Sequence, residues 1–342
     1  MSDAATRPGW RFDWLTALGP YLGLALVVGL FSLLTWQRGE LHTFWRLDTL
    51  QLVAVHASIM AAVAVGMTLI MISGGIDLSV GYVVSLATVT TVLAYRAADA
   101  TPWLAGMASV CAIAAGVGTG AAAGLCNGLV ITQLRVVPFI ATLGMLGLSR
   151  GLAQHISEGR PVTFPDPIHP PEWVRWFRLV EPEPEWLQIG PAAWSVLLLA
   201  AVAAVLLRYT VLGRYCYALG SSEATARLCG IPVARTKVLI YILAGVVTGW
   251  AGVLQTARSG SGFYNVRAGL ELEVIAAVVI GGASLSGGEG SVGGTIAGAL
   301  LLAVLDIGCS KLHLPNEFRF IVIGGIIVVV AALNQWRQGR AR

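Results

Sequence analysis

The sequence predicts an all-α integral membrane protein of about ten transmembrane helices, with broken helices near the membrane interior and both termini in the cytoplasm. The first observation behind this class is composition, since 56% of the 342 residues are hydrophobic and 12% are charged. A soluble protein carries roughly 25% charged residues, because its surface faces water. The second is a mean hydropathy of +0.76, and the third is a series of long apolar runs. Together they exclude a soluble enzyme, a disordered segment and a disulfide scaffold.

Ten apolar runs are candidate spans, because a helix needs about 20 apolar residues to cross a hydrocarbon core about 30 Å thick. They lie near 18–36, 51–72, 78–95, 103–131, 138–156, 191–207, 238–257, 272–283, 292–308 and 319–336. The first run is too long for the apolar part of a secretory signal and is predicted to be a retained helix. The run 272–283 is short unless it extends into 266–271, and 51–95 is either two helices or one long broken element.

The orientation follows from the distribution of Lys and Arg, which favour cytoplasmic loops. The loop 208–237 holds five of these cations against one acid, whereas 157–190 holds six acids and three arginines. We therefore expect a cytoplasmic tail at 1–17, one transmembrane domain over 18–336 and a basic cytoplasmic tail at 337–342. Within the domain, 157–190 is predicted to be a periplasmic loop and 208–237 a cytoplasmic loop.

Glycine is the most informative residue type, with 41 copies. Many lie at small-x-x-x-small spacing, which lets helix backbones approach closely inside a bilayer. These sets are Gly116/Gly120/Gly124, Gly245/Gly249 and Gly290/Gly294/Gly298. Two further clusters, 73–81 and 281–294, interrupt apolar stretches with paired glycines and hydroxyl residues. Irregular backbone at membrane depth is tolerated where protein or water surrounds it, so both clusters predict broken helices or tight turns at the cytoplasmic ends of helical hairpins.

Recognisable catalytic motifs are missing from the sequence. The Gly-rich runs lack the Lys of a phosphate-binding loop, the five histidines are never four residues apart, and the five cysteines form no C-x-x-C pair. We therefore expect no catalytic residue, no metal site and no cofactor, and any ATP-driven work would come from another subunit. The net charge of +4 is too diffuse to indicate nucleic-acid binding.

A few polar residues inside apolar stretches are candidates for a translocation pathway: Asp77, Ser79, Asn127 and Glu273. Asp77 either lines the pathway and braces a broken helix, or caps the following helix together with Ser79. Asn127 bonds either a neighbouring helix or a solute. Glu273, with Glu271, lies either at an outer mouth or in a helix first turn, where acids are favourable.

The segment 217–241 predicts a short amphipathic helix between two spans. The helix runs from Ser221 to Leu228, with Ser221 or Ser222 as its N-cap, and Gly230 and Pro232 end it. Glu223 and Arg227 lie four residues apart on one face, where they form an ion pair. The segment is either a solvated connector or a docking helix for a cytoplasmic partner.

Five ordered segments carry a resemblance to a known family: GMTLIMISGGIDLSVG (66–81), NGLVITQLRVVPFIATLGML (127–146), GRPVT (159–163), GRYCYALGSSEATARLCGI (213–231) and ELEVIAAVVIGGASLSGGEGSVGGT (271–295). In these segments the chain resembles the permease subunits of the ribose/multiple-sugar branch of ABC importers, which are more distantly related to the branched-chain amino-acid permeases. The resemblance covers nearly the whole chain after about residue 50.

This resemblance implies an assembly in the bacterial inner membrane. Two permease subunits, identical or related, form the pathway, two cytoplasmic ATP-binding subunits drive it, and a periplasmic binding protein delivers a sugar or sugar-like solute. Alternating access is the implied mechanism. The residues that it assigns to ATPase coupling are Gly220, Glu223, Ala226, Arg227 and Gly230. The chain departs from the family where Ser221 and Ser222 replace a frequent Gly-Asn pair, and in a long loop at 164–188 that is rich in Trp and acids.

Two other classes of function compete with this interpretation. A secondary transporter driven by an ion gradient would need intramembrane acids, for which Asp77 and Asp306 are the candidates. A membrane-embedded enzyme would need a nucleophile or a metal set, and the sequence contains neither in recognisable form. The sequence does not separate a homodimer of permeases from a heterodimer.

Overall fold

The computed structural model describes residues 14–37, 44–178, 189–267, 269–312 and the single positions 315, 321, 324 and 325. Several predicted features therefore lie outside the described residues. These are most of the N-terminal tail, the acidic run 181–186, nearly all of the span 319–336 and the basic tail 337–342.

The described chain is almost entirely helical. Its long helices are α1 (Trp14–Gln37), α3 (Leu47–Ile72), α4 (Val80–Asp99), α5 (Ala108–Gln133), α6 (Pro138–Ile156), α8 (Pro191–Tyr209), α11 (Val233–Ser259) and α13 (Val292–Lys311). Its shorter helices are η1 (Ala105–Met107), α7 (Glu172–Arg178), α9 (Val211–Ser221), α10 (Glu223–Leu228) and α12 (Leu270–Ile280). Two short strands, β1 (Val162–Thr163) and β2 (Ser261–Gly262), pair antiparallel with Val162 opposite Gly262.

Seven of the described helices are long and apolar enough to cross a membrane: α1, α3, α4, α5 with its η1 turn, α8, α11 and α13. The predicted stretch 51–95 is two of them, α3 and α4. Helix α6 has 19 residues but is not in this set, since Arg150 and His155 lower its hydropathy. Within the predicted run 272–283, α12 has 11 residues and is about 16 Å long, roughly half of the hydrocarbon thickness, so this helix alone does not cross the core.

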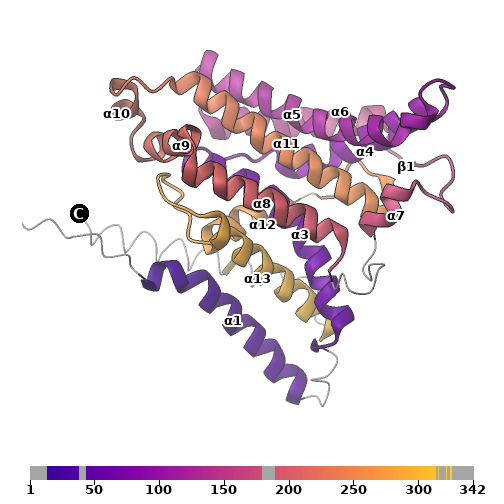
Figure 1. Ribbon diagram of the computed structural model, residues 1–342, viewed down its shortest axis with the longest axis horizontal. Helices are drawn as coiled ribbons and strands as arrows, with labels where there is room; N and C mark the ends of the chain where they lie inside the picture. Colours follow the sequence, from indigo (N-terminus) through magenta and orange to yellow (C-terminus); the bar gives the residue numbers. More distant parts are fainter. Residues whose placement is uncertain are drawn as a thin grey trace, which may run out of the picture.

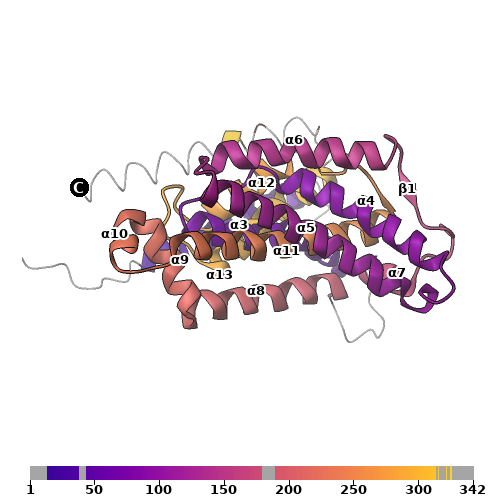
Figure 2. The same ribbon diagram turned by 90° about the horizontal axis from the view of Figure 1, so that it is seen from above.

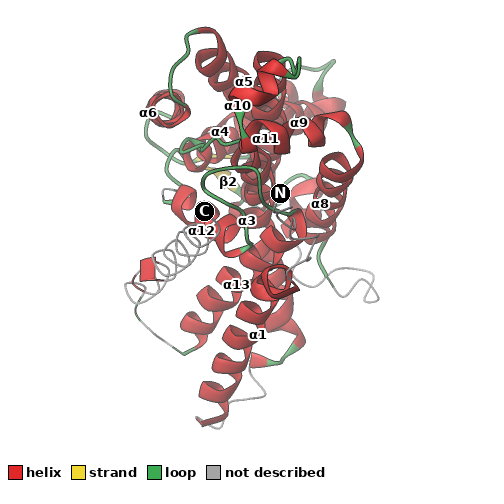
Figure 3. Cartoon of the chain, turned by 90° about the vertical axis from the view of Figure 1, so that its left-hand side faces the viewer, coloured by secondary structure: helices red, strands yellow, loops and turns green. Residues whose placement is uncertain are grey.

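The helices form a layered bundle around α3, whose membrane-length window is 94% buried by protein. Figure 2 shows α6 along one face and α8 along the opposite face, with α3, α5 and α11 between them. Helix α1 packs against α13 at the edge of the bundle (Figures 1 and 3). The bundle thus surrounds α3 with helices that themselves expose apolar side chains.

The two ends of the bundle differ in their elements and in their charge. Helices α9 and α10 lie at one end, and α7 with β1 lies at the other (Figure 1). The first end, which we call the basic end, carries Arg135, Arg208, Arg214, Arg227, Arg235 and Lys237. The predicted cytoplasmic loop 208–237 and the turn that contains Arg135 therefore share one end of the bundle.

Glycines bring α5 and α11 into backbone contact. A side-chain carbon added at Gly120 would overlap the Gly245 carbonyl oxygen and the Gly249 backbone, and one added at Gly124 would overlap the Tyr241 carbonyl. The prediction of close helix approach is confirmed for these two helices. Gly290 differs, because it lies in the loop before α13 with a φ of +151°, so the third predicted set is a loop glycine followed by two helix glycines.

Both predicted helix breaks are confirmed. Helix α3 ends at Ile72 and α4 begins at Val80, while α12 ends at Ile280 and α13 begins at Val292. The two breaks contact each other, since the Gly288 amide donates to the Ile72 carbonyl at 2.9 Å. Residues more than 200 positions apart thus share one joint, which the sequence pattern did not predict.

We predict that Gly120→Ala destabilises the bundle, because the new methyl group forces α5 and α11 apart, and overpacking costs about 1–3 kcal/mol. The matched control is Gly118→Ala on the same helix, where an added carbon meets no atom within 4 Å. The control should be as stable as the parent or slightly more so, because Ala favours helix over Gly. Thermal unfolding in mild detergent measures both, and equal midpoints would contradict the prediction.

Candidate coupling and translocation sites

The docking segment, residues 210–232, is two short helices with local capping. The Thr210 hydroxyl accepts the Gly213 amide at the start of α9, and the Ser222 hydroxyl accepts the Thr225 amide at the start of α10. Of the two predicted caps, Ser222 is therefore the N-cap. The predicted loop 208–237 is thus largely helical, because hydroxyl caps at Thr210 and Ser222 start α9 and α10.

Gly230 ends α10 through the backbone pattern that glycine favours at helix C-termini. Its φ of +79° lies in the left-handed region. The Gly230 amide donates to the Arg227 carbonyl and the Ile231 amide donates to the Ala226 carbonyl, both at 3.1 Å, which completes a Schellman motif. Ala226 is buried against Leu219 and Val233. Ala226 therefore anchors α10 by packing, and Gly230 ends the helix.

Glu223 carries the ion pairs of the docking segment. Its Oε1 lies 3.1 Å from Arg227 Nη2, as predicted, and its Oε2 lies 2.6 Å from Lys237 Nζ at the start of α11. The hydrogen bond from Lys237, then its positive charge and that of Arg227, hold the pKa of the Glu223 carboxyl below its usual value of 4.5. The carboxylate thus ties α10 to α11 at neutral pH.

Gly220 lies where α9 touches both helix breaks. A side-chain carbon at this position would overlap the Ile72 carbonyl oxygen and the Gly288 amide, and one at Gly287 would lie 2.9 Å from the Cα atoms of Gly74 and Gly220. We call Gly74, Gly220, Gly287 and Gly288 the glycine junction. Gly74, Gly287 and Gly288 also have φ values of +78° to +86°, which favour glycine. The docking segment therefore contacts the α3–α4 and α12–α13 breaks through glycine backbone atoms, with no side chain between them.

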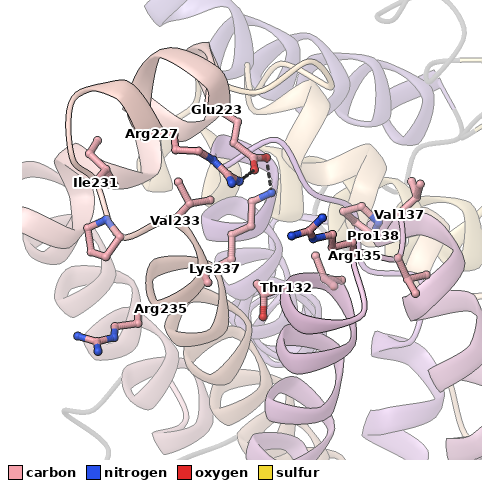
Figure 4. Close-up of a pocket in the computed structure, with 14 residues that line it drawn as sticks. Thr132, Arg135, Val137, Pro138, Glu223, Arg227, Ile231, Val233, Arg235 and Lys237 are labelled. Atoms are coloured by element: carbon pink, nitrogen blue, oxygen red, sulfur yellow. Dashed lines mark hydrogen bonds and ion pairs between the residues drawn. The ribbon is translucent and has the colours of Figure 1, made fainter.

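A groove of about 760 Å³ opens beside α10. One wall is formed by α10 and the start of α11, and the other by the turn between α5 and α6, which contains Arg135 (Figure 4). Glu223, Arg227 and Lys237 line the same groove. We call this cavity the basic groove.

Three of the four predicted pathway residues form one buried polar cluster. Asp77, Ser79 and Asn127 are 7%, 1% and 2% exposed. Asp77 Oδ1 accepts the Ser79 amide at 2.8 Å and the Ser79 hydroxyl at 2.5 Å. Asn127 Nδ2 lies 3.3 Å from Ser79 Oγ and 3.5 Å from Asp77 Oδ2. Asp77 thus braces the turn before α4, and Asn127 links that turn to α5.

Two residues that the sequence did not single out complete the surroundings of this cluster. The Thr142 hydroxyl on α6 accepts the Leu78 amide at 3.2 Å, so a second helix supports the break. The Tyr241 hydroxyl, close to Gly75, is buried without a hydrogen-bond partner among the described residues. A hollow of about 10 Å³ lies beside Asp77, at the lower limit for one water molecule.

Glu273, the fourth predicted pathway residue, lies apart from this cluster in the first turn of α12, with Glu271. The position agrees with the interpretation that first-turn acids favour the helix dipole. The Glu271 carboxylate faces Gly81, where an added carbon would lie 2.5 Å from Oε2. The start of α12 therefore packs against the start of α4, and both helices begin inside the bundle.

A charged triad was missed in the sequence. His56 Nε2 on α3 lies 2.6 Å from Asp306 Oδ2 on α13, and Arg258 Nη2 on α11 lies 3.0 Å from His56 Nδ1. A guanidinium only donates hydrogen bonds, so Nδ1 accepts and the ring proton is on Nε2. Asp306 and Arg258 lie 250 and 202 positions from His56 along the chain, and no sequence spacing indicates that they meet.

The fold and these sites define a class first. A bundle of apolar helices, seven of the described ones long enough to cross a membrane and broken at two points that meet capped helices at one end, is a multi-pass membrane protein.

Comparison with known proteins gives the family. The model of the family described as the permease component of the branched-chain amino acid transport system matches residues 49–331. The chain is 33% identical to the ribose import permease protein RbsC of Escherichia coli (strain K12), over 95% of each chain. It is 37% identical to the RbsC of Bacillus subtilis (strain 168), over 92% of this chain and 91% of the relative.

The chain belongs to this family of permease components. It is also 33% identical to the L-arabinose ABC transporter permease protein AraH of Azospirillum brasilense, over 83% of this chain and 79% of the relative. No solved structure matches the chain. The resemblance read from the five motifs is confirmed, and the comparisons give no support to the secondary-transporter alternative.

We predict that α10 is held at neutral pH and released by acid. Because the pKa of Glu223 is lower in the folded protein, its contribution is present above pH 4.5 and is lost as the pH falls through the lowered value. A spin label on Cys229, directly after α10 and exposed, reports this when the other four cysteines are replaced. The label should become mobile in acid, and Glu223→Gln should make it mobile at every pH. A Glu223→Gln spectrum equal to the parent's at pH 7 would contradict the prediction.

We predict that Asp77→Asn keeps the fold and Asp77→Leu loses it. The amide oxygen of Asn still accepts from Ser79, whereas Leu leaves the buried amide and hydroxyl donors of Ser79 without their acceptor, at about 1–3 kcal/mol for each group. Thermal unfolding in detergent measures the difference. Equal midpoints for the two variants would show that these hydrogen bonds do not support the break.

Proposed function

We propose that this chain is the translocating subunit of an ATP-driven importer that moves a sugar or sugar-like solute into the cytoplasm. The observation that carries the proposal is the glycine junction, because it connects the docking segment directly to both helix breaks. A partner that moves α9 and α10 therefore moves the backbone beside the buried polar cluster. The solute class rests on the relatives that are named for ribose and L-arabinose.

The proposed topology has ten crossings and both termini in the cytoplasm, within one permease domain over 18–336. The basic end faces the cytoplasm, in accord with the preference of Lys and Arg for that side. Strand β2, the turn residues 264–267 and α12 together make one crossing, since α12 alone is too short. A second permease subunit, identical or related, completes the pathway, and a periplasmic binding protein meets the end that carries α7.

In the proposed mechanism the pathway opens alternately to the periplasm and to the cytoplasm. The ATPase subunits bind the docking segment, Glu223 and Arg227 keep α10 in the binding position, and Ala226 and Gly230 maintain its shape. Gly220 transmits the movement to the breaks at Gly74 and Gly287. Asp77, Ser79 and Asn127 hold the α4 turn beside the pathway, and Glu273 lies nearer the start of α12. The binding protein supplies selectivity, so the pathway itself needs little affinity.

The experiment is purification from the native membrane in mild detergent, followed by reconstitution into vesicles. We expect a subunit with a nucleotide-binding loop to copurify, and radiolabelled ribose to enter the vesicles only when the binding protein is outside and ATP is on the ATPase side. A non-hydrolysable ATP analogue should abolish uptake. Uptake by the chain alone, driven by an ion gradient, would overturn the proposal.

We predict that Gly220→Ala keeps the ATPase bound but lowers uptake at least about tenfold, because the methyl group separates α9 from the two breaks. Gly29→Ala on α1 is the matched control, since an added carbon there meets no atom within 4 Å. Uptake per ATPase subunit retained is the measurement. Parent-like uptake by Gly220→Ala would show that the junction does not transmit the movement.

A further inference from the structure

The basic groove gathers three cations around one carboxylate. Arg227 and Lys237 both bind Glu223, and Figure 4 shows the Arg135 guanidinium reaching toward the Lys237 amine from the opposite wall. In the described part of the chain, Arg135 has neither a hydrogen bond nor an ion pair of its own. Counting these four side chains, the groove holds an excess of two positive charges. A concave site in which one sign of charge predominates attracts a group of the opposite sign.

The backbone places Arg135 in this position at a conformational cost. Its φ of +55° lies in the left-handed region, where non-glycine residues other than Asn and Asp are uncommon. The turn follows the end of α5 at Gln133 and precedes Pro138, the first residue of α6. The two helices thus hold the guanidinium at the mouth of the groove, on a short and constrained turn.

The surroundings of the groove fit a protein partner. Helix α10 lies at the far end of the bundle (Figure 1), and Leu228, next to Arg227, is 89% exposed. A leucine that is almost fully exposed beyond the membrane-spanning helices fits an interface that excludes water. The groove also has apolar walls, which include Ile131 and Ile231. An acidic side chain flanked by apolar residues complements both features.

Resting on the function proposed above, we propose that Arg135 anchors the ATPase subunit by binding a carboxylate side chain that the subunit inserts into the basic groove. Arginine suits this role because its planar guanidinium binds a carboxylate through two parallel hydrogen bonds. The ATPase then holds two elements of the permease, α10 and the α5–α6 turn. Movement of the second element reaches the buried polar cluster along α5, which carries Asn127.

The test uses the assembly purified from its native membrane. In Arg135→Lys the side chain keeps its charge, and a water-soluble carbodiimide joins its amine to a carboxylate in direct contact, forming an amide with loss of water. We expect peptide mapping to find the introduced lysine bonded to an Asp or Glu of the subunit that carries the nucleotide-binding loop.

Two controls accompany this reaction. The native Lys237–Glu223 pair, with 2.6 Å between Nζ and Oε2, should cross-link within the chain and shows that the reagent reaches the groove. Arg208→Lys is the matched control, because Arg208 is exposed at the end of α8 with its guanidinium 5.5 Å from the Tyr209 ring, outside the groove. We expect no bond from this position to the ATPase.

A second variant measures affinity without straining the turn. Asn adopts the left-handed region more readily than most residues, so Arg135→Asn removes the charge and keeps the backbone. We expect it to weaken binding of the ATPase at least about tenfold, while Arg135→Lys retains most of the affinity.

Three outcomes would overturn this inference while the proposed function stands. In each of them the ATPase copurifies and Lys237 cross-links to Glu223. In the first, the introduced lysine at position 135 forms no bond, and in the second it bonds only to the carboxylate of an anionic lipid such as phosphatidylserine. In the third, Arg135→Asn binds the ATPase as tightly as the parent. If the parent chain retains no ATPase at all, the proposed function fails and the inference fails with it.

Discussion

The arrangement of the helices depends on one site, the glycine junction, where backbone atoms of three segments are in direct contact because glycines leave no side chains between them. At the glycine junction the end of α3, the α12–α13 loop and the end of α9 meet, and one hydrogen bond, from the Gly288 amide to the Ile72 carbonyl, closes the joint. Inside a bilayer an exposed peptide group costs several kcal/mol. The two breaks supply hydrogen-bond partners for some of each other's peptide groups. Neither break is therefore a self-contained turn.

The same constraint explains why polar residues gather at the first break. Residues 73–79 leave amides and carbonyls outside any helix, and the side chains of Asp77 and Thr142 bind some of them. The buried Asp77 carboxylate is therefore first a hydrogen-bond acceptor for the backbone. The polar turn lies beside the site where α5 and α11 pack through glycines.

Sequence patterns predicted the parts that depend on local chemistry. Ser222 as a cap, Gly230 as a helix end, the Glu223–Arg227 pair and both breaks follow from residue types at fixed spacing, and the structure contains them all. Hydropathy predicted most spans, but within 272–283 the apolar helix α12 is too short to cross alone, and an apolar run does not reveal where a helix begins.

The sequence did not predict contacts between residues that are far apart along the chain. Gly220 was assigned to a partner interface, yet it lies against Ile72 and Gly288. Lys237 reaches Glu223 from α11, Arg135 lines the same groove from the turn between α5 and α6, and Glu273 lies in the first turn of α12. Spacing along one helix describes one face of that helix, whereas these contacts depend on how the helices pack.

The Arg258–His56–Asp306 triad has an electrical consequence for the other half of the bundle. The guanidinium contributes one positive charge, the carboxylate contributes one negative charge, and the imidazole between them contributes none, so the bridge is neutral. Asp306 therefore links α13 to α3 through His56. The two charged groups lie on α11 and α13, so any motion that separates these two helices pulls opposite charges apart where the dielectric constant is low and their attraction is strong.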